Sequence, residues 1–209
     1  MRVISIFDRS GVMVQPWHLA GHSVLTIDIE PARHDMPSIQ ADITKLDPTM
    51  FNADIVFAFP PCTEFAGSGA RWWASKPSHL LENAIVLLDA ARAWVSIAQK
   101  YWLLENPIGR LSSIWRPADW AFNPHEYAGW SDSPDDEAYT KMTCIWANFL
   151  APVRKSVVPV LGSKMHMLPP GPERQYLRSI TPQGFARAIH QHLSQDQPEQ
   201  QQLWEIKNI

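Results

Sequence analysis

Two short segments of the chain carry residue types suited to covalent attack on a pyrimidine ring. Phe59-Pro60-Pro61-Cys62 ends one apolar run with a thiol, and Glu105-Asn106-Pro107 ends another with a carboxylic acid. C5 of cytosine is a poor nucleophile, but addition of a thiolate at C6 makes it enamine-like. The charge that develops on the ring needs a protonated acid near N3, buried enough to keep its proton. We therefore expect Cys62 to be the nucleophile and Glu105 the acid.

The two prolines before Cys62 stiffen the approach to its thiol. Each proline fixes its own φ angle, and Pro60 also restricts Phe59. In the alternative interpretation, Cys62 is a small buried apolar residue and the prolines only end a strand. The acid at a second strand end favours the functional interpretation, because the reaction needs both groups.

The composition limits the class of protein. At 209 residues, of which 45% are hydrophobic, the chain fits a single globular domain. A net charge of -3 provides no general basic field, so contact with a polynucleotide must depend on a local patch. The two cysteines, Cys62 and Cys144, make no disulfide framework and indicate a reducing compartment.

The sequence also bears on location and metals. No stretch reaches the roughly 18 consecutive apolar residues of a membrane span. The start, Met1-Arg2-Val3, leads into a strand-like run rather than a signal peptide, so we expect a cytoplasmic protein with no membrane partner. The histidines lack metal-ligand spacing, and we expect residues 131–136 to form a solvated acidic loop, so no metal site is predicted.

The pattern of apolar residues predicts the fold class. Apolar runs at residues 3–7, 22–27, 54–59 and 101–104 predict strands. From 78 to 99 the apolar side chains follow helical spacing, which predicts a helix with one buried face. Alternating strands and helices predict an α/β fold, with a mostly parallel central sheet and helices on both faces. Ligands of such sheets bind at the carboxyl ends of the strands, which is the expected position of Phe7, Asp28, Cys62 and Glu105.

The turn after the first strand has some features of a nucleotide site. Gly11 lets the backbone approach a ligand, but the chain has no Gly-x-Gly-x-x-Gly pattern. Asp28 or Glu30 is placed either to bind ribose hydroxyls or simply to end the second strand in solvent. Asp42 either accepts a hydrogen bond from an adenine amino group or caps a turn.

These segments, taken in order, resemble a known enzyme family. They are similar in order and spacing to the motifs of S-adenosylmethionine-dependent cytosine-C5 methyltransferases, above all of short phage-type members. The matching segments are Phe7-Asp8-Arg9-Ser10-Gly11, Asp28-Ile29-Glu30, Ala41-Asp42-Ile43, Phe59-Pro60-Pro61-Cys62 and Glu105-Asn106-Pro107. The resemblance covers about residues 3 to 190. It implies a Rossmann-like methyltransferase fold, S-adenosylmethionine as cofactor, and a protein that a phage encodes and that acts in the host cytoplasm.

The resemblance also implies roles for individual residues. The cofactor-binding residues would be Phe7, Asp8, Ser10, Gly11, Asp28, Ile29, Asp42, Ile43, Phe59, Pro60, Ser179 and Thr181. The substrate-binding residues would be Pro61, Asn106, Pro107, Arg71, Lys141 and Thr143. Lys141 or Thr143 would replace the arginine of a Gln-Arg-x-Arg segment, which this chain lacks.

The C-terminal third departs from full-length relatives. Only about 30 residues separate Trp146 from Ser179, where those relatives insert a target-recognition domain, so reading of a base sequence in the major groove has no obvious place. We expect a catalytic domain over residues 1–194 and a polar tail over 195–209. A last helix is predicted with Thr181 as N-cap and Pro182 at the first helical position.

The substrate remains open between two possibilities. The first is cytosine in DNA with little sequence preference, with phosphates held by Arg71, Arg110, Arg116 and Lys76 and bases stacked on Trp72, Trp73, Trp115, Trp120 and Trp130. The second is a free deoxycytidine nucleotide, whose reaction would not fall steeply with salt. A folate-dependent pyrimidine enzyme and a non-catalytic cofactor- or DNA-binding decoy are further alternatives. The sequence indicates no oligomeric state.

Overall fold

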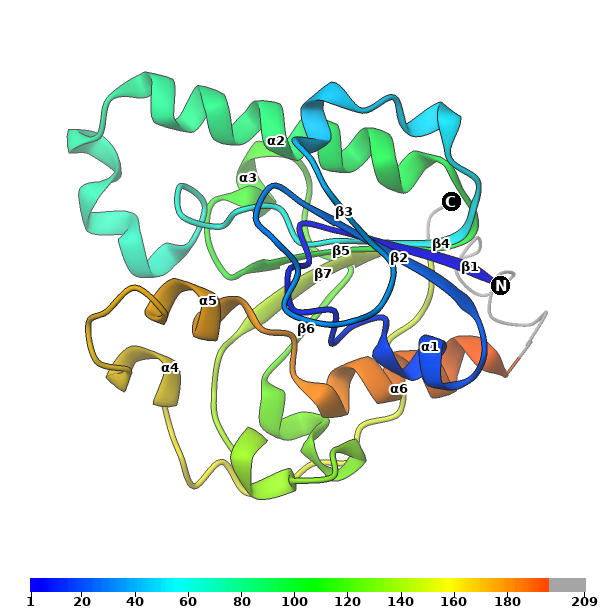
Figure 1. The fold of residues 1–209 in the computed structure, drawn as a ribbon. Coiled ribbons are helices and arrows are strands. Elements are labelled where there is room, and N and C mark those ends of the chain that lie inside the picture. Colours follow the sequence, from blue (N-terminus) through cyan, green and yellow to red (C-terminus); the bar gives the residue numbers. More distant parts are fainter. Residues whose placement is uncertain (196–209) are drawn as a thin grey trace.

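The computed structural model describes residues 1–195 and contains one seven-stranded sheet with the order β3-β2-β1-β4-β5-β7-β6 (Figure 1). The strands are β1 (Arg2–Ile6), β2 (Ser23–Asp28), β3 (Ser38–Gln40), β4 (Ala53–Ala58), β5 (Ala98–Pro107), β6 (Trp120–Phe122) and β7 (Thr143–Ala147). Neighbouring strands from β3 to β5 pair in parallel, whereas β7 pairs antiparallel with both β5 and β6. The predicted Rossmann-like α/β class is therefore confirmed.

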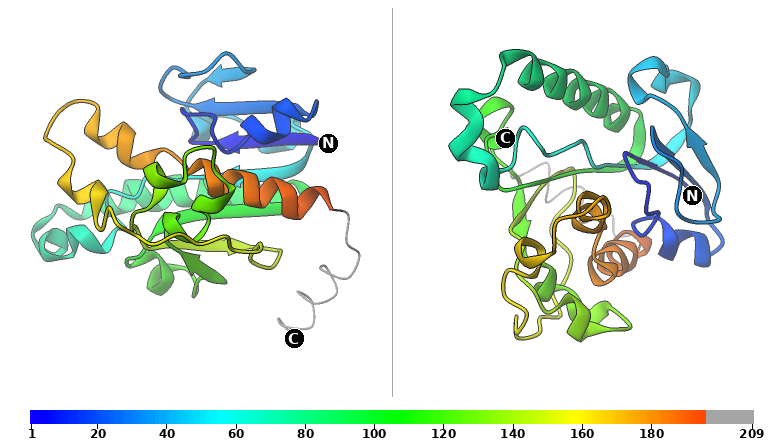
Figure 2. Two further views of the ribbon diagram at one scale, coloured as in Figure 1. Left: turned by 90° about the horizontal axis from the view of Figure 1, so that it is seen from below. Right: turned by 60° about the vertical axis from the view of Figure 1, so that its left-hand side comes forward.

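Helices cover both faces of the sheet (Figures 1 and 2). The helices are α1 (Gln15–Leu19), α2 (Ser78–Ser96), α3 (Leu111–Ile114), α4 (Lys164–Met167), α5 (Arg174–Ser179) and α6 (Gln183–Ser194). Helix α2 covers one face, and α1 and α6 pack together on the other. Because successive strand residues point to opposite faces, Val3 belongs to the core under α6 and Ile4 to the core under α2.

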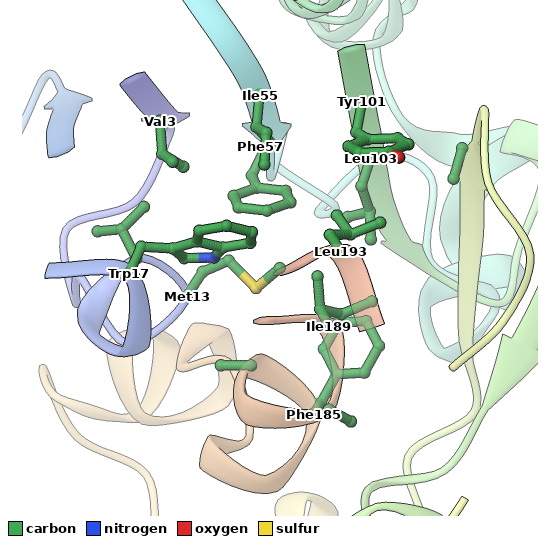
Figure 3. Close-up of a cluster of buried hydrophobic side chains, with 14 of the residues drawn as sticks. Val3, Met13, Trp17, Ile55, Phe57, Tyr101, Leu103, Phe185, Ile189 and Leu193 are labelled. Carbon is green, nitrogen blue, oxygen red and sulfur yellow. The ribbon is translucent and has the colours of Figure 1, made fainter. Parts of the chain in front are cut away.

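The core beneath α1 and α6 joins the two ends of the chain. Figure 3 shows Met13 and Trp17 facing Phe185 and Ile189 across the end of this cluster, with Phe57 of β4 above them. Trp17, Phe57 and Phe185 are all buried. Burial of a large apolar side chain stabilises a fold by about 1.5–3 kcal/mol, so this cluster holds α6 against the first strands.

The elements predicted from the sequence are present with small shifts. The helix expected over residues 78–99 ends at Ser96, and residues 98 and 99 already belong to β5. No helix within residues 1–195 combines the length and the apolar character that crossing a bilayer requires. Apart from Gln195, the predicted polar tail lies outside the described residues.

The predicted cap of the last helix is wrong. Thr181 makes no capping hydrogen bond, and Pro182, with φ -59° and ψ 133°, is extended, so α6 begins only at Gln183. The carboxylate of Glu137 instead accepts hydrogen bonds from the backbone N–H groups of Gln183 and of Gly184, the latter at 2.9 Å. A side chain distant in sequence therefore satisfies the first free N–H groups of the helix.

Candidate functional site

The sheet gathers the four predicted rim positions at one edge. Phe7 directly follows β1, Asp28 ends β2, Cys62 lies in the loop after β4, and Glu105 lies near the end of β5. These strands run parallel, so their carboxyl ends meet on the same side of the molecule. This arrangement brings the nucleophile candidate and the acid candidate together from positions more than forty residues apart.

The charge of Glu105 acts on the ionisation of Cys62. Burial raises the pKa of the partly buried Cys62 thiol, and the charge of Glu105 raises that pKa further, whereas Lys141 and Arg178 lower it. Burial likewise raises the pKa of Glu105, and Lys141 opposes this shift. A raised pKa keeps a proton on Glu105, and a protonated Glu105 no longer disfavours the thiolate of Cys62.

A small cavity lies beside Glu105. Its volume is about 10 Å³, roughly the space of one water molecule. It is lined by Phe59, Glu105, Phe122, Lys141, Thr143, Ser179, Ile180, Thr181, Pro182 and Phe185. Six of these ten residues are predicted site residues, so the C-terminal segment does meet the end of β5. Cys62 is not part of this lining; it lies in the loop after β4.

The residues before α6 cover this cavity. The side chain of Lys141 donates a 2.9 Å hydrogen bond to the carbonyl oxygen of Arg178 and so ties the start of β7 to the end of α5. Thr143 is buried, and its hydroxyl donates to the carbonyl oxygen of Lys141. Arg178 was not predicted as a site residue. Its charge lowers the pKa of Cys62, and this effect depends on a tertiary approach that no local sequence pattern indicates.

Backbone hydrogen bonds join the loop after Cys62 to the loop after Glu105. The N–H of Gly67 donates to the carbonyl oxygen of Ile108 at 2.8 Å, and the N–H of Arg110 donates to that of Phe65 at 2.9 Å. A side chain at Gly109 would place its Cβ only 1.9 Å from the carbonyl oxygen of Phe65. Only glycine therefore permits this close approach, and the loop after Cys62 is fixed to the loop after Glu105.

Side chains add to this connection. Asn106 is fully buried, and its amide donates a 2.9 Å hydrogen bond to the carbonyl oxygen of Pro60. Glu64, which the sequence analysis did not identify, forms a salt bridge of 2.7 Å with Lys76. The guanidinium of Arg110 donates to the backbone carbonyl oxygen of Glu64. Pro61 is exposed and Pro107 is partly buried within β5.

The loop after β1 is built around a buried carboxylate. Asp8 accepts hydrogen bonds from the hydroxyl groups of Ser5 and Ser10 and from the N–H of Gly11. Phe7 has a φ of 56°, a left-handed conformation that is rare for a bulky residue and is found more often at functional sites. Gly11 is also left-handed, and a Cβ there would collide with the ring of His34, so the segment after β2 packs over this turn.

The remaining cofactor candidates differ in their accessibility. One carboxylate oxygen of Asp28 accepts the N–H of Glu30, while the other has no hydrogen-bond partner within residues 1–195, and burial raises the pKa of Asp28. Ile29 is exposed beside it, whereas Ile43 is buried in the core. Asp42 caps a short turn by accepting hydrogen bonds from the N–H and hydroxyl of Thr44.

Most of the proposed phosphate-binding side chains already have partners. Arg116 makes a two-point ion pair with Asp119, and Lys76 pairs with Glu64. Arg71 is exposed and makes no ion pair within the described part of the chain. Of the tryptophans named above, Trp72 is mostly exposed, and the others are partly buried, namely Trp73, Trp115, Trp120 and Trp130. No group of three His, Cys, Asp or Glu residues within 1–195 is arranged to hold a metal ion.

Comparisons with known proteins give distant similarities. No protein-family model and no curated protein match the chain. Among solved structures, it is similar to the Dnmt2 methyltransferase of S. pombe, at 17% identity and a TM-score of 0.43, covering 69% of this chain and 47% of that one. It is also similar to methyltransferase EhMeth of Entamoeba histolytica, at 12% identity and a TM-score of 0.45, covering 70% and 52%.

A mutant DNMT2 of Spodoptera frugiperda is similar at 15% identity and a TM-score of 0.41, with 69% of this chain and 49% of that chain covered. The chain thus spans about half the length of these solved structures. Similarity at this level carries no conclusion about what the present chain binds, and the function proposed below depends on its own site.

Proposed function

We propose that this protein transfers a methyl group from S-adenosylmethionine to C5 of cytosine in DNA, through a covalent adduct of Cys62 and with little intrinsic sequence readout. One observation carries the proposal: Cys62, in the loop after β4, and Glu105, near the end of β5, lie at one rim of the sheet, and the charge of Glu105 raises the pKa of Cys62. A thiol and a protonated carboxyl group in this relationship suit attack on a pyrimidine from two sides.

The protein's part in the reaction follows from these two groups. Sγ of Cys62, once deprotonated, forms a bond to C6 of cytosine, and Glu105 holds a proton at N3 as negative charge moves onto the ring. The ring carbon C5 then has the electron density to take up a methyl group. Transfer of the C5 proton to solvent water then lets the C6–S bond break, and the bonding electrons return to sulfur as the thiolate. Lys141 and Arg178 assist because their charges lower the pKa of Cys62.

The residues at the ends of β1 and β2 fit the nucleoside part of the cofactor. The free carboxylate oxygen of Asp28 is available to accept hydrogen bonds from ribose hydroxyls, and the exposed Ile29 offers an apolar surface for adenine. Phe7 would pack on the same ring. Asp42 would bind adenine through a carboxylate whose Oδ1 already caps its turn and whose Oδ2 lies 3.5 Å from Nζ of Lys45. When bound, S-adenosylmethionine supplies an electrophilic methyl group.

The other predicted contacts divide in the same way between cofactor and substrate. Phe59, Ser179 and Thr181 line the cavity beside Glu105 and would close the cofactor side of the site, while Lys141 and Thr143 would approach the cytosine.

Labelled cofactor tests the proposal directly. The protein is incubated with methyl-labelled S-adenosylmethionine and, separately, deoxycytidine monophosphate, single-stranded DNA and duplex DNA. We expect transfer to a DNA substrate, abolished in Cys62→Ser and kept in Cys144→Ser, whose thiol is buried in β7. Transfer that survives in Cys62→Ser would exclude the covalent route, and no transfer to any substrate would favour the binding-only alternative.

A further inference from the structure

An exposed aromatic and a cation lie together just after the Cys62 loop. In the 3₁₀ segment Gly67–Ser75, the guanidinium of Arg71 lies 5.0 Å from the centre of the Trp72 ring. Trp72 is 55% exposed, and Arg71 is exposed as well. A tryptophan in this state offers an apolar surface to solvent, whereas Trp17, Trp94 and Trp146 are buried in the core.

The segment around this pair is anchored to the loops after Cys62 and Glu105. The neighbouring Trp73 lies under the guanidinium of Arg110, 4.5 Å from the ring centre. Arg110 in turn donates to the carbonyl oxygen of Glu64, whose carboxylate binds Lys76. The position of Trp72 relative to Cys62 is therefore set by contacts on both sides of it, as a fixed platform near a reacting base requires.

In a chain of net charge -3, Lys141 and Arg178 act on Cys62, and Arg71 is exposed on the 3₁₀ segment that follows the Cys62 loop. Arg71, Lys141 and Arg178 make no salt bridge with a carboxylate within residues 1–195, whereas arginines on other surfaces do, for example Arg92 with Asp89. The 3₁₀ segment and α5, which ends in Arg178 and Ser179, lie at the same end of the molecule (Figures 1 and 2). Cations without a carboxylate partner on the 3₁₀ segment and on α5 can attract phosphates.

The rim between these cations also exposes apolar side chains. Ile108, just after β5, is 58% exposed, and Met142, just before β7, is 43% exposed. They are neighbours, because the N–H of Ile108 donates to the carbonyl oxygen of Met142. Cations interleaved with aromatic and apolar surface are typical of sites for unpaired nucleotides, whose bases stack while their phosphates meet positive charge.

We infer that the substrate of this site is single-stranded DNA, with Trp72 stacking on a base next to the target cytosine and Arg71 binding its phosphate. This inference rests on the proposed function and adds the substrate class to it. Bases in a duplex present only their edges to a protein, and a free nucleotide has no neighbouring base for Trp72 to hold. The described residues between β7 and α6 contain only the short helices α4 and α5, neither of which is long enough to read a major groove.

Binding measured apart from chemistry tests the inference. A fluorescently labelled single strand of about 12 nucleotides is titrated with the protein, and anisotropy is followed at several salt concentrations. Trp72→Ala is expected to weaken binding at least about fivefold, which corresponds to about 1 kcal/mol of base stacking. Trp72→Phe, which keeps a ring, should recover part of the loss. Arg71→Ala should make binding less dependent on salt.

Arg92→Ala is the matched control. Arg92 is also an exposed arginine near a tryptophan, with its guanidinium 5.3 Å from the ring centre of Trp115, but it lies on α2. We expect this variant to bind the single strand as the unchanged protein does. Equal binding by Trp72→Ala and the unchanged protein would overturn the inference, as would tighter binding of duplex than of single strand.

Methyl transfer separates this inference from the proposed function. Transfer to deoxycytidine monophosphate as efficient as transfer to the single strand would overturn the inference while leaving the C5 chemistry intact. Trp72-dependent binding of the single strand without any methyl transfer would support the inference on this surface and overturn the proposed reaction.

Discussion

The side-chain amide of Asn106 donates a 2.9 Å hydrogen bond to the carbonyl oxygen of Pro60. This bond joins the strand that carries Glu105 to the loop that carries Cys62, and it is buried from solvent. This bond therefore adds to the backbone hydrogen bonds that hold the segments of Cys62 and Glu105 together.

Removal of the Asn106 amide should affect both stability and reaction. In Asn106→Ala the buried carbonyl group of Pro60 loses its donor, and we expect the free energy of unfolding to fall by about 1–3 kcal/mol. Because the Cys62 loop is then less well placed, methyl transfer should fall up to about 100-fold. Urea unfolding and single-turnover kinetics measure the two effects.

Asn148→Ala is the control for this variant. Asn148 also joins backbone segments, accepting from the N–H of Trp102 and donating to the carbonyl oxygen of Lys100, but at the opposite end of β5. Its loss should lower stability and leave the rate per folded molecule unchanged. If both variants lose activity equally, the Asn106 bond has no special part in positioning Cys62.

Replacement of Glu105 should separate stability from activity. Burial raises the pKa of Glu105, so its contribution to stability is fully present below the unfolded value of about 4.3 and is lost as pH rises through the folded pKa. Glu105→Gln does not titrate. The unchanged protein should therefore lose stability relative to this variant as pH rises above about 4.

Urea unfolding of the two proteins over a series of pH values measures this divergence, and methyl transfer by Glu105→Gln should fall by about 100-fold or more. Glu82→Gln, an exposed change on α2, serves as the control and should show neither effect. A stability difference that does not vary with pH would mean that the pKa of Glu105 is the same in the folded and the unfolded protein.

The charge of Lys141 should set the pH range of the reaction. Its charge lowers the pKa of both Cys62 and Glu105, so Lys141→Met should raise both. The reaction needs a thiolate and a protonated acid, and both limbs of the profile of kcat/KM against pH should therefore move to higher pH. Lys141→Arg keeps the charge and should keep the limbs in place. An unshifted profile in Lys141→Met would remove this lysine from the site.

A methyl group at Gly109 should separate the loop after Cys62 from the loop after Glu105. Gly109→Ala places a Cβ 1.9 Å from the carbonyl oxygen of Phe65, so the hydrogen bonds between the loops must break or shift. We expect a loss of about 1–3 kcal/mol in the free energy of unfolding and faster proteolysis of the loop after Cys62. At Gly171 no atom lies within 4 Å of the added Cβ, so Gly171→Ala should behave as the unchanged protein does.

Some of this site follows from sequence because it depends on local pattern. Alternating apolar runs and the helical spacing before β5 predict a parallel sheet, and a parallel sheet brings the ends of its strands to one edge. The position of Phe7, Asp28, Cys62 and Glu105 at that edge therefore needed no knowledge of side-chain contacts. Residues 78–96 form α2 for the same reason, since their spacing gives one continuous apolar face.

The contacts that tune the site were decided only by the tertiary structure. Thr181 is a reasonable cap by its type, yet Glu137, brought close by folding, binds the start of α6 instead. Arg178 reaches the environment of Cys62, and Gly109 fits against Phe65, through approaches between segments far apart in the chain. Periodicity in a sequence specifies which face of an element is buried, but the partner that meets a given polar atom is selected by the packing of the whole fold.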